Sequence, residues 1–263
     1  MKILATYNIK GGVGKTAAAV NLAYLAARDG ARTLVWDLDP QGAATFYFRI
    51  KAKVKGGGER LIGGKNGLES AIKGTDYPRL DLLPADFSYR HLDILLDGEK
   101  KPTKRFKKLL APLAASYDYL FLDCPPSISL VSEAVFGAAE ILLVPIIPTP
   151  LSLRTLEQIF AFERDEGLKD LKILPFFSMV DRRKSLHREI VESLPQQRPE
   201  VLEAEIPYAS EVEQMGIRRL PLAAYAPHSR AAHAFAELWQ EIRDHLDGAC
   251  PASPGSDSHM YGS

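Results

Sequence analysis

The chain has 263 residues, of which 46% are hydrophobic and 25% are charged, as in an average soluble globular protein. Such a chain can bury a sizeable core without disulfides or a structural metal. Because 33 Lys and Arg residues balance 33 Asp and Glu residues, a globally basic protein is excluded, although a local basic patch is not.

Three further observations bound the class of protein. The only cysteines are Cys124 and Cys250, which excludes a disulfide scaffold and a multi-cysteine metal site within one chain. The longest apolar run, residues 141–147, is far below the ~20 residues of a membrane span. The N-terminus lacks the pattern of a signal peptide. We therefore expect a cytoplasmic protein.

Short apolar segments alternate with stretches of helical spacing along the chain. The apolar segments predict strands at residues 3–7, 33–39, 80–83, 117–123, 141–147, 173–180 and 201–206. Most are apolar at consecutive positions, which is typical of strands covered on both faces. The spacing predicts helices at residues 15–28, 129–139, 152–166, 184–194 and 229–246. This alternation predicts a single α/β domain over residues 1–247, with a mostly parallel twisted sheet flanked by helices on both faces.

Two segments interrupt the alternation. Residues 49–67 carry six basic residues among six glycines, which predicts a mobile basic loop. An ordinary solvated insertion is favoured over a loop that orders on dimerisation, and no motif indicates a function for it. Residues 248–263 have too few apolar side chains to pack, so we expect a disordered tail.

A glycine-rich loop, KGGVGKT at residues 10–16, follows the first predicted strand. Glycines let backbone N–H groups face an anion, and the helix that begins here directs the positive end of its dipole to the same point. Lys15 is then expected to reach the β- and γ-phosphates of a nucleotide, and the Thr16 hydroxyl to bind Mg²⁺. The usual Walker A pattern has a glycine where this chain has Ile9, whereas Lys10 adds a second lysine.

Two acidic segments suit magnesium-nucleotide chemistry. Asp37 and Asp39 stand two residues apart on a predicted strand, so their side chains are expected on the same side, at the strand end where ligands bind in open α/β sheets. Asp123 follows four apolar residues, as in a Walker B strand. Carboxylates at these places are expected to bind metal-bound water and to position an attacking water.

These motifs resemble the ParA/MinD family of deviant Walker A P-loop ATPases, whose loop reads KGGxGK[ST]. The resemblance continues through DLDPQG at 37–42, LDCPP at 122–126, the proline-rich segment 144–150 and Ile-Pro at 206–207, and it covers nearly the whole chain except the tail. Asn8 and the DPQG turn are more similar to the ParA (Soj-like) branch than to the MinD branch. The resemblance implies a Mg²⁺-dependent ATPase that binds ATP and ADP.

The resemblance also assigns roles to single residues. It implies that Lys10 crosses to the nucleotide of a partner subunit, that Asp39 positions the hydrolytic water, and that Lys15 completes the catalytic group. The implied magnesium residues are Thr16, Asp37 and Asp123. The implied nucleotide contacts are Gly11, Gly12, Val13, Gly14, Lys15, Thr16, Ala17 and Pro207. Ala17 stands where many members have a second threonine.

Members of the ParA branch form ATP-dependent homodimers that bind nonspecific DNA, and a ParB-like or cargo-adaptor protein stimulates their hydrolysis. The resemblance therefore implies a nucleoid-associated protein that drives plasmid or chromosome partition, or cargo positioning. Two basic groups are the expected DNA contacts: Arg182, Arg183, Lys184 and Arg188, and then Arg218 and Arg219. A third run, at residues 100–108, is more typical of an amphipathic helix with a solvated face. One departure is Tyr208, where the Soj-like branch often has arginine.

Two other functional classes fit the sequence less well, and a third stays open. A MinD-like protein would need a basic amphipathic C-terminal helix on lipid, but the helix at 231–246 carries Glu237, Glu241 and Asp244 on its polar face. Its apolar stripe is more typical of core packing, so we expect no membrane association. An iron-protein reductase would need two spaced cluster cysteines. An amidoligase of the dethiobiotin or cobyrinate kind, using ATP on a small carboxylate, stays open as the alternative.

Overall fold

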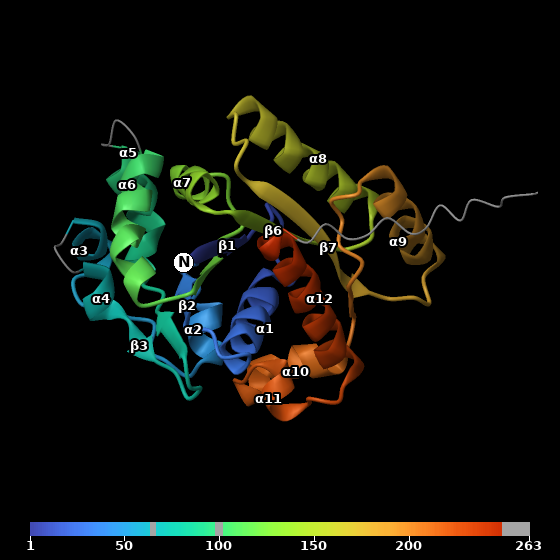
Figure 1. Cartoon of the computed structure of the whole chain (residues 1–263), viewed down its shortest axis with the longest axis horizontal. Coiled ribbons are helices and arrows are strands. Elements are labelled where there is room, and N and C mark those ends of the chain that lie inside the picture. Colours follow the sequence, from blue (N-terminus) through green and yellow to red (C-terminus); the bar gives the residue numbers. More distant parts are fainter. Residues whose placement is uncertain (64–66, 98–101, 249–263) are drawn as a thin grey trace, which may run out of the picture.

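The structure is a computed structural model that describes residues 1–63, 67–97 and 102–248. Its centre is an eight-stranded sheet with the order β3-β4-β2-β5-β1-β6-β7-β8 (Figure 1). Neighbouring strands are parallel, except that β3 is antiparallel to β4. The strands are β1 (Lys2–Thr6), β2 (Thr33–Asp37), β3 (Lys73–Gly74), β4 (Leu80–Leu83), β5 (Tyr119–Asp123), β6 (Ile141–Ile146), β7 (Lys172–Val180) and β8 (Glu205–Pro207).

Helices cover both faces of this sheet, as Figure 1 shows. One face carries α1 (Lys15–Arg28), α2 (Ala43–Tyr47), α10 (Ser210–Arg218), α11 (Leu222–Tyr225) and α12 (Arg230–Asp247). The other carries α3 (Gly57–Gly63), α4 (Gly67–Ala71), α5 (Leu92–Asp97), α6 (Pro102–Leu110), α7 (Leu130–Ala138), α8 (Pro150–Asp165) and α9 (Ser185–Gln197), with two 3₁₀ helices at Phe87–His91 and Ala111–Ala115. The predicted α/β class is confirmed.

The central strands are buried because each has a helical layer on both sides. Along β2 every residue is buried, with Leu34 and Trp36 in one core cluster and Val35 in the other. Alternate side chains of a strand point to opposite faces, so a strand covered twice needs apolar residues at consecutive positions. This is the physical reason that the apolar runs of the sequence marked the strands.

The prediction for residues 49–67 is wrong in part, because residues 57–63 form α3. Val54 and Leu61 are buried between basic and glycine residues, and they tie the segment to the core. Backbone groups are held as well: the Val54 N–H donates to Asp86 Oδ2 (2.8 Å), and the Gly58 N–H donates to Ser88 Oγ (2.8 Å). The expectation for residues 64–66, like that for the tail beyond Gly248, lies outside the described residues.

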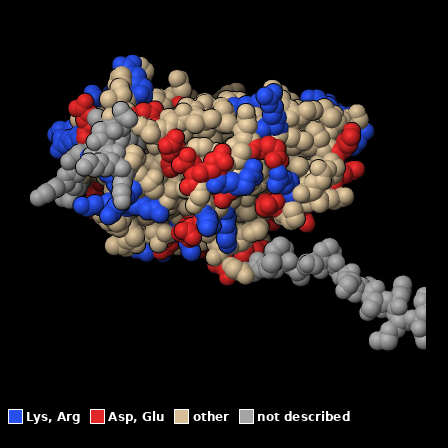
Figure 2. All heavy atoms as spheres, turned by 90° about the horizontal axis from the view of Figure 1, so that it is seen from above, with Lys and Arg blue, Asp and Glu red and all other residues tan. Residues whose placement is uncertain are grey.

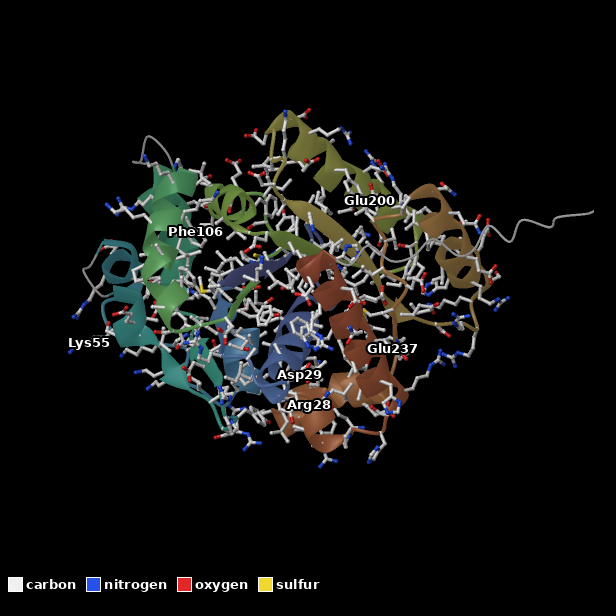
Figure 3. The ribbon with its side chains drawn as sticks, viewed as in Figure 1. Arg28, Asp29, Lys55, Phe106, Glu200 and Glu237 are labelled. Carbon is white, nitrogen blue, oxygen red and sulfur yellow. The ribbon has the colours of Figure 1, made fainter. Side chains whose placement is uncertain are left out.

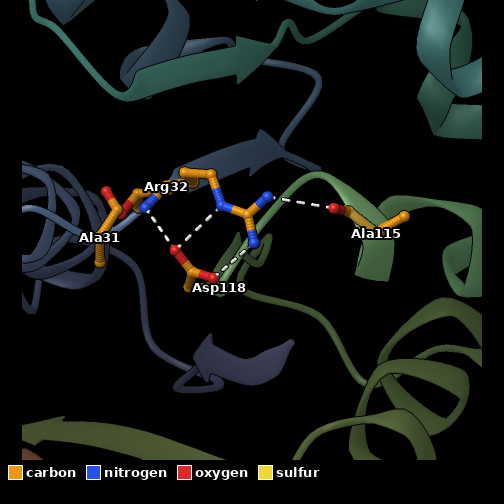
Figure 4. Close-up of polar contacts among 5 residues, drawn as sticks. Ala31, Arg32, Ala115 and Asp118 are labelled. Carbon is orange, nitrogen blue, oxygen red and sulfur yellow. Dashed lines mark hydrogen bonds and ion pairs between the residues drawn. The ribbon is translucent and has the colours of Figure 1, made fainter.

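Arg32 fastens the sheet at the edge where its strands begin. Its backbone N–H and Nε both donate to Asp118 Oδ2 (2.8 and 3.2 Å), and Nη2 donates to Asp118 Oδ1 (2.7 Å) (Figure 4). Nη1 also donates to the Ala115 carbonyl (3.1 Å). The guanidinium holds the pKa of Asp118 at about 2. These bonds join the start of β2 to the start of β5, so the opposite ends of both strands are fixed relative to each other.

Candidate active site

A cavity of about 300 Å³ lies where β1, β2 and β7 end. The glycine-rich loop and Asp39 form one side, and the residues that follow β8 form the other. The residues of the loop and of the first turn of α1 that line it are Gly11, Gly12, Gly14, Lys15, Thr16 and Ala17. Ligands of open α/β sheets bind at this carboxyl edge.

The loop takes a shape that depends on Gly14. Gly14 stands just before the first residue of α1 and has a φ of 95°, a left-handed conformation that strains other residues. A Cβ atom at this position would lie 2.8 Å from Ser178 Oγ, so space is lacking as well. With Gly14 there, the first N–H groups of α1 are left facing the cavity without a side-chain cap. An anion such as phosphate is the partner that such N–H groups favour.

The two lysines of the loop differ in environment. Lys15 is 7% exposed, and its Nζ donates to the Lys10 carbonyl (2.8 Å) across the loop. Burial lowers the pKa of Lys15, and the carboxylates of Asp123 and Asp39 oppose that effect. The Lys10 side chain is only partly buried, does not line the cavity, and takes no hydrogen bond or ion pair within residues 1–63, 67–97 and 102–248.

Asn8 fixes the start of the loop, which sequence reasoning did not foresee. Its Oδ1 accepts the Lys10 backbone N–H (2.9 Å), and its Nδ2 donates to the Pro145 carbonyl (2.9 Å). The loop is therefore tied to the end of β6. The sequence had marked Asn8 only as a feature of the ParA branch.

Asp37 and Asp39 do not both lie on a strand, so that expectation is wrong. β2 ends at Asp37, which is fully buried, and Asp39 follows in a turn and lines the cavity. Asp37 Oδ2 accepts both the backbone N–H and the hydroxyl of Thr45 (2.7 Å each). Asp39 Oδ1 accepts the Gln41 N–H (2.9 Å), which closes the turn. The buried aspartate thus holds α2 in place, and the turn presents its neighbour to the cavity.

Asp123 is a buried carboxyl group with one oxygen that accepts no hydrogen bond from a described residue. It is fully buried at the end of β5, in register with Asp37, and the Thr6 hydroxyl donates to its Oδ1 (3.3 Å). Its Oδ2 is buried without a hydrogen-bond partner in the part of the chain that is described. Burial raises the pKa of Asp123 well above its usual range, and the nearby Asp37 adds to this. A hydrated cation beside Thr16 would satisfy this oxygen, so the donor set fits Mg²⁺.

The far side of the cavity is more apolar. Pro207 lines it as expected, together with Phe176, Met179, Tyr208, Val212 and Phe235, which the sequence analysis did not assign to the site. Met179 has a φ of 55°, where the pairing of β7 with β8 is irregular. The Tyr208 phenol bonds Glu213, and this contact raises its pKa. A flat apolar group such as a base would fit this side.

The predicted DNA contacts occupy two separate places. Helix α9 forms as expected, and Arg182, Arg183, Lys184 and Arg188 are exposed around its start. Arg182 forms an ion pair with Glu205, and Arg183 with Asp181, so both charges are partly neutralised. At the end of α10, Arg218 is exposed but Arg219 lies over the Phe46 ring (4.4 Å) and donates to the Phe46 carbonyl (2.9 Å).

The packing of α12 and of Cys124 can be read from the core. Phe235, Leu238, Trp239 and Ile242 of α12 are buried, so the prediction of core packing is confirmed. Cys124 is also buried, and burial raises the pKa of its thiol, which keeps the thiol protonated. Among the described helices, none has the length and apolar character to cross a membrane.

Comparison with known proteins places this geometry in a family. The AAA domain family matches residues 1–166. The sporulation initiation inhibitor protein Soj of Bacillus subtilis is 31% identical over 247 residues, which cover 92% of this chain and 98% of Soj. The chromosome partitioning protein ParA of Myxococcus xanthus is 29% identical over 248 residues, which cover 92% of this chain and 87% of that protein.

A solved structure agrees in fold and in ligand class. The structure of cobyrinic acid a,c-diamide synthase from Mycobacterium smegmatis, with bound ADP and magnesium, has a TM-score of 0.78 at 26% identity. The match covers 95% of this chain and 97% of the synthase. ADP and magnesium are the kind of ligands expected from the loop, although this relative belongs to the alternative functional class. The sequence matches carry the assignment: the chain belongs to the ParA/Soj family of P-loop ATPases.

Proposed function

We propose that this protein is a partition or positioning ATPase that binds Mg²⁺-ATP, dimerises face to face around it, and binds nonspecific DNA as the dimer. The observation that carries the proposal is the contrast between the two lysines of one loop. Lys15 is buried beside the cavity, whereas the Lys10 side chain has no hydrogen-bond or ion-pair partner within its own described chain. In the proposed dimer, the nucleotide bound by the second subunit gives the Lys10 ammonium group a phosphate to bind.

The residues of the cavity have different proposed roles in phosphoryl transfer. Lys15 and the loop N–H groups, from Gly11 to Thr16, hold the phosphates, with Ala17 at the edge of the same surface. Thr16, Asp37 and Asp123 would hold Mg²⁺, Asp123 through a metal-bound water. When bound, Mg²⁺ neutralises charge on the phosphates. Asp39 accepts a hydrogen bond from the attacking water and orients it for in-line attack, while Pro207 encloses the base.

Dimerisation is proposed to depend on the γ-phosphate. Lys10 of each subunit would reach the phosphates bound by the other, so that removal of the γ-phosphate weakens the interface. Because hydrolysis then ends the DNA-bound state, the protein would act as a timed switch. A ParB-like or cargo-adaptor protein would shorten that time by stimulating hydrolysis.

The proposed setting follows from the family. Relatives are named for chromosome partitioning, and the ATPase domain of residues 1–247 is proposed to work in the cytoplasm on the nucleoid. Arg182, Arg183, Lys184, Arg188, Arg218 and Arg219 are the first candidates for DNA contacts. Membrane binding through α12 is disfavoured because its apolar face is buried.

One observation favours a second candidate function. The similarity to cobyrinic acid a,c-diamide synthase keeps an ATP-dependent amidoligase open. Such an enzyme needs a small carboxylate substrate and no DNA. ATP hydrolysis that rises with DNA or a partner protein, in the absence of any small substrate, would argue against it.

Sedimentation velocity tests the proposal directly. Purified protein would be compared with ADP, with ATP, and with ATP plus random-sequence DNA, using Asp39→Ala to slow turnover. The expected result is a monomer with ADP, a dimer with ATP, and a DNA complex that weakens as salt rises. A dimer that ignores DNA would contradict the partition function, and a monomer in ATP would contradict the shared site.

A further inference from the structure

Two segments at one end of the molecule are basic and have few carboxylates. Residues 51–60 contain Lys51, Lys53, Lys55 and Arg60 against one carboxylate, Glu59. Helix α6 contains Lys104, Arg105, Lys107 and Lys108 and no acidic residue. In a chain without net charge this is a strong local imbalance. We call these two segments the basic end.

Both segments are fixed to the same part of the core. Phe106 of α6 stacks on Trp36 of β2, with ring centroids 5.5 Å apart. Gly58 packs closely on Tyr89 and Leu92, which belong to the same core cluster as Trp36. Val54 and Leu61 are buried in the same cluster. The basic end is therefore part of the folded surface and presents its charges in a fixed arrangement.

The charges of the basic end point outward. Lys51, Lys55, Arg60, Lys104, Lys107 and Lys108 are exposed, and none forms an ion pair with a described residue. Figure 2 shows Lys and Arg side chains on the outside of the end that carries α3 to α6 in Figure 1, and others along the rest of this face. Figure 3 shows Lys55 at the outer margin of this end and Phe106 on the inner side of α6. By contrast, Arg182 and Arg183 are paired with carboxylates.

We propose that the basic end is a surface for the phosphate backbone of DNA, in addition to or in place of the arginines at α9. Unpaired, exposed lysines on a fixed surface release counterions from DNA when they bind, whereas paired arginines must first separate from their carboxylates. In the two segments of the basic end, the large apolar side chains of Val54, Phe106 and Leu110 are buried and cannot insert into lipid. A phosphate backbone therefore fits it better than a bilayer does.

This inference rests on the proposed function, since it names the surface through which the ATP-bound dimer meets DNA. Three charge-matched variants test it. The first carries Lys51→Gln, Lys55→Gln and Arg60→Gln, and the second carries Lys104→Gln, Lys107→Gln and Lys108→Gln. The control carries Arg28→Gln, Arg164→Gln and Lys169→Gln, which are exposed on α1, on α8 and just beyond α8 and have no ion pair in the described chain. Figure 3 shows Arg28 far from the basic end.

DNA affinity of the ATP-bound proteins would be measured by fluorescence anisotropy over a series of salt concentrations. The log–log salt dependence should become shallower by up to about 2.7 in each basic-end variant, at about 0.9 for each phosphate that is no longer neutralised, and should not change in the control. Basal ATPase activity and thermal unfolding should stay as in the parent protein, which shows that the variants fold.

The possible failures are distinguishable. If the parent protein binds DNA and both basic-end variants keep its salt dependence, the basic end is not the DNA surface and the proposed function stands. If the ATP-bound parent ignores DNA, the proposed DNA step fails and this inference fails with it. If the variants no longer bind vesicles that contain phosphatidylserine but still bind DNA, the surface binds lipid headgroups and the assignment to DNA is wrong.

Discussion

Arg49, which follows α2, and Arg219, which follows α10, join the ends of these two helices by reciprocal hydrogen bonds to backbone carbonyls. Arg49 Nε donates to the Arg219 carbonyl (3.2 Å), and Arg219 Nε donates to the Phe46 carbonyl (2.9 Å). The first bond joins the end of α10 to the residue just after α2, and the second joins α2 back to α10. Both helices line the nucleotide cavity, α2 through Tyr47 and α10 through Glu213. The pair therefore fixes the spacing of the two walls.

Arg219→Ala should lower the free energy of unfolding by about 1–2 kcal/mol, because it removes a hydrogen bond and a cation–π interaction at a half-buried site. Nucleotide binding should weaken as the walls loosen. Arg219→Gly should cost less, since Arg219 has a φ of 54° that glycine adopts without strain. Urea denaturation checks both, with Arg218→Ala as the neighbouring control. Weaker DNA binding with unchanged stability in Arg219→Ala would instead identify Arg219 as a DNA contact.

Thr45 joins the buried aspartate to the strand beside it. Its hydroxyl donates to Asp37 Oδ2 (2.7 Å) and accepts the Ala85 N–H (2.8 Å). Thr45→Val should lower the free energy of unfolding by roughly 1–3 kcal/mol because it leaves buried polar groups with fewer partners. ATPase activity should fall because the turn that carries Asp39 loosens. Thr45→Ser keeps the hydroxyl and should retain most of both; equal losses in the two variants would show that the hydroxyl is not the cause.

The buried carboxyls should make the nucleotide-free protein less stable as pH rises. Burial raises the pKa of Asp37 from 3.8 to about 6, and it raises the pKa of Asp123 well above its usual range, with Asp37 adding to the effect. The folded protein therefore binds these protons more tightly than the unfolded chain does. Their stabilising effect is complete below the unfolded pKa of 3.8 and disappears as pH rises through the folded values.

Asp123→Asn removes one of these ionisations. It should unfold at higher urea concentration than the parent protein at about pH 8 without nucleotide, and the difference should shrink towards about pH 4. ATPase activity should be abolished, because the carboxylate proposed to hold Mg²⁺ is gone. An equal pH dependence in variant and parent would show that Asp123 does not titrate as described.

Substitution of Lys15 should impair nucleotide binding, whereas substitution of Lys10 should impair turnover. Lys15→Ala should weaken ATP binding by roughly ten- to a hundredfold, because it removes a buried charge-assisted hydrogen bond to phosphate. Lys10→Ala should keep most of the affinity and abolish turnover. Isothermal titration calorimetry with Mg²⁺-ATP, under conditions where the protein is monomeric, separates the two. An equal drop in affinity would refute a separate role for Lys10.

The sequence predicted the features that repeat or that stand in a motif. Consecutive apolar residues marked the buried strands, and the glycines of residues 10–16 marked the loop that the structure places at the cavity. It did not predict α3, because Gly57 and Gly58 have weak helix propensity and the segment is held by Asp86 and Ser88 from elsewhere in the chain.

Hydrogen bonds between residues far apart in the sequence could not be predicted either, because they depend on segments that only the fold brings together. Asn8 bonds Pro145 across 137 positions, and Arg219 bonds Phe46 across 173. Neither pair has a periodic pattern that would reveal it. The arginines were predicted as DNA contacts from their charge and from the family resemblance, and neither says whether a carboxylate or an aromatic ring lies beside them in the fold.

The shared active site is the central claim, and mixing two inactive variants tests it most directly. Lys10→Ala lacks the lysine proposed to cross the interface, and Asp39→Ala lacks the aspartate that orients water within its own subunit. In a mixed dimer, the site of the Lys10→Ala subunit has its own Asp39 and receives Lys10 from the other subunit. If pairing is random at equal concentrations, about half of the dimers are mixed, and each mixed dimer has one complete site out of two. About a quarter of the parent ATPase activity should therefore return. Activity that stays at the level of the separate variants would contradict the account, because Lys10 would then act within its own subunit.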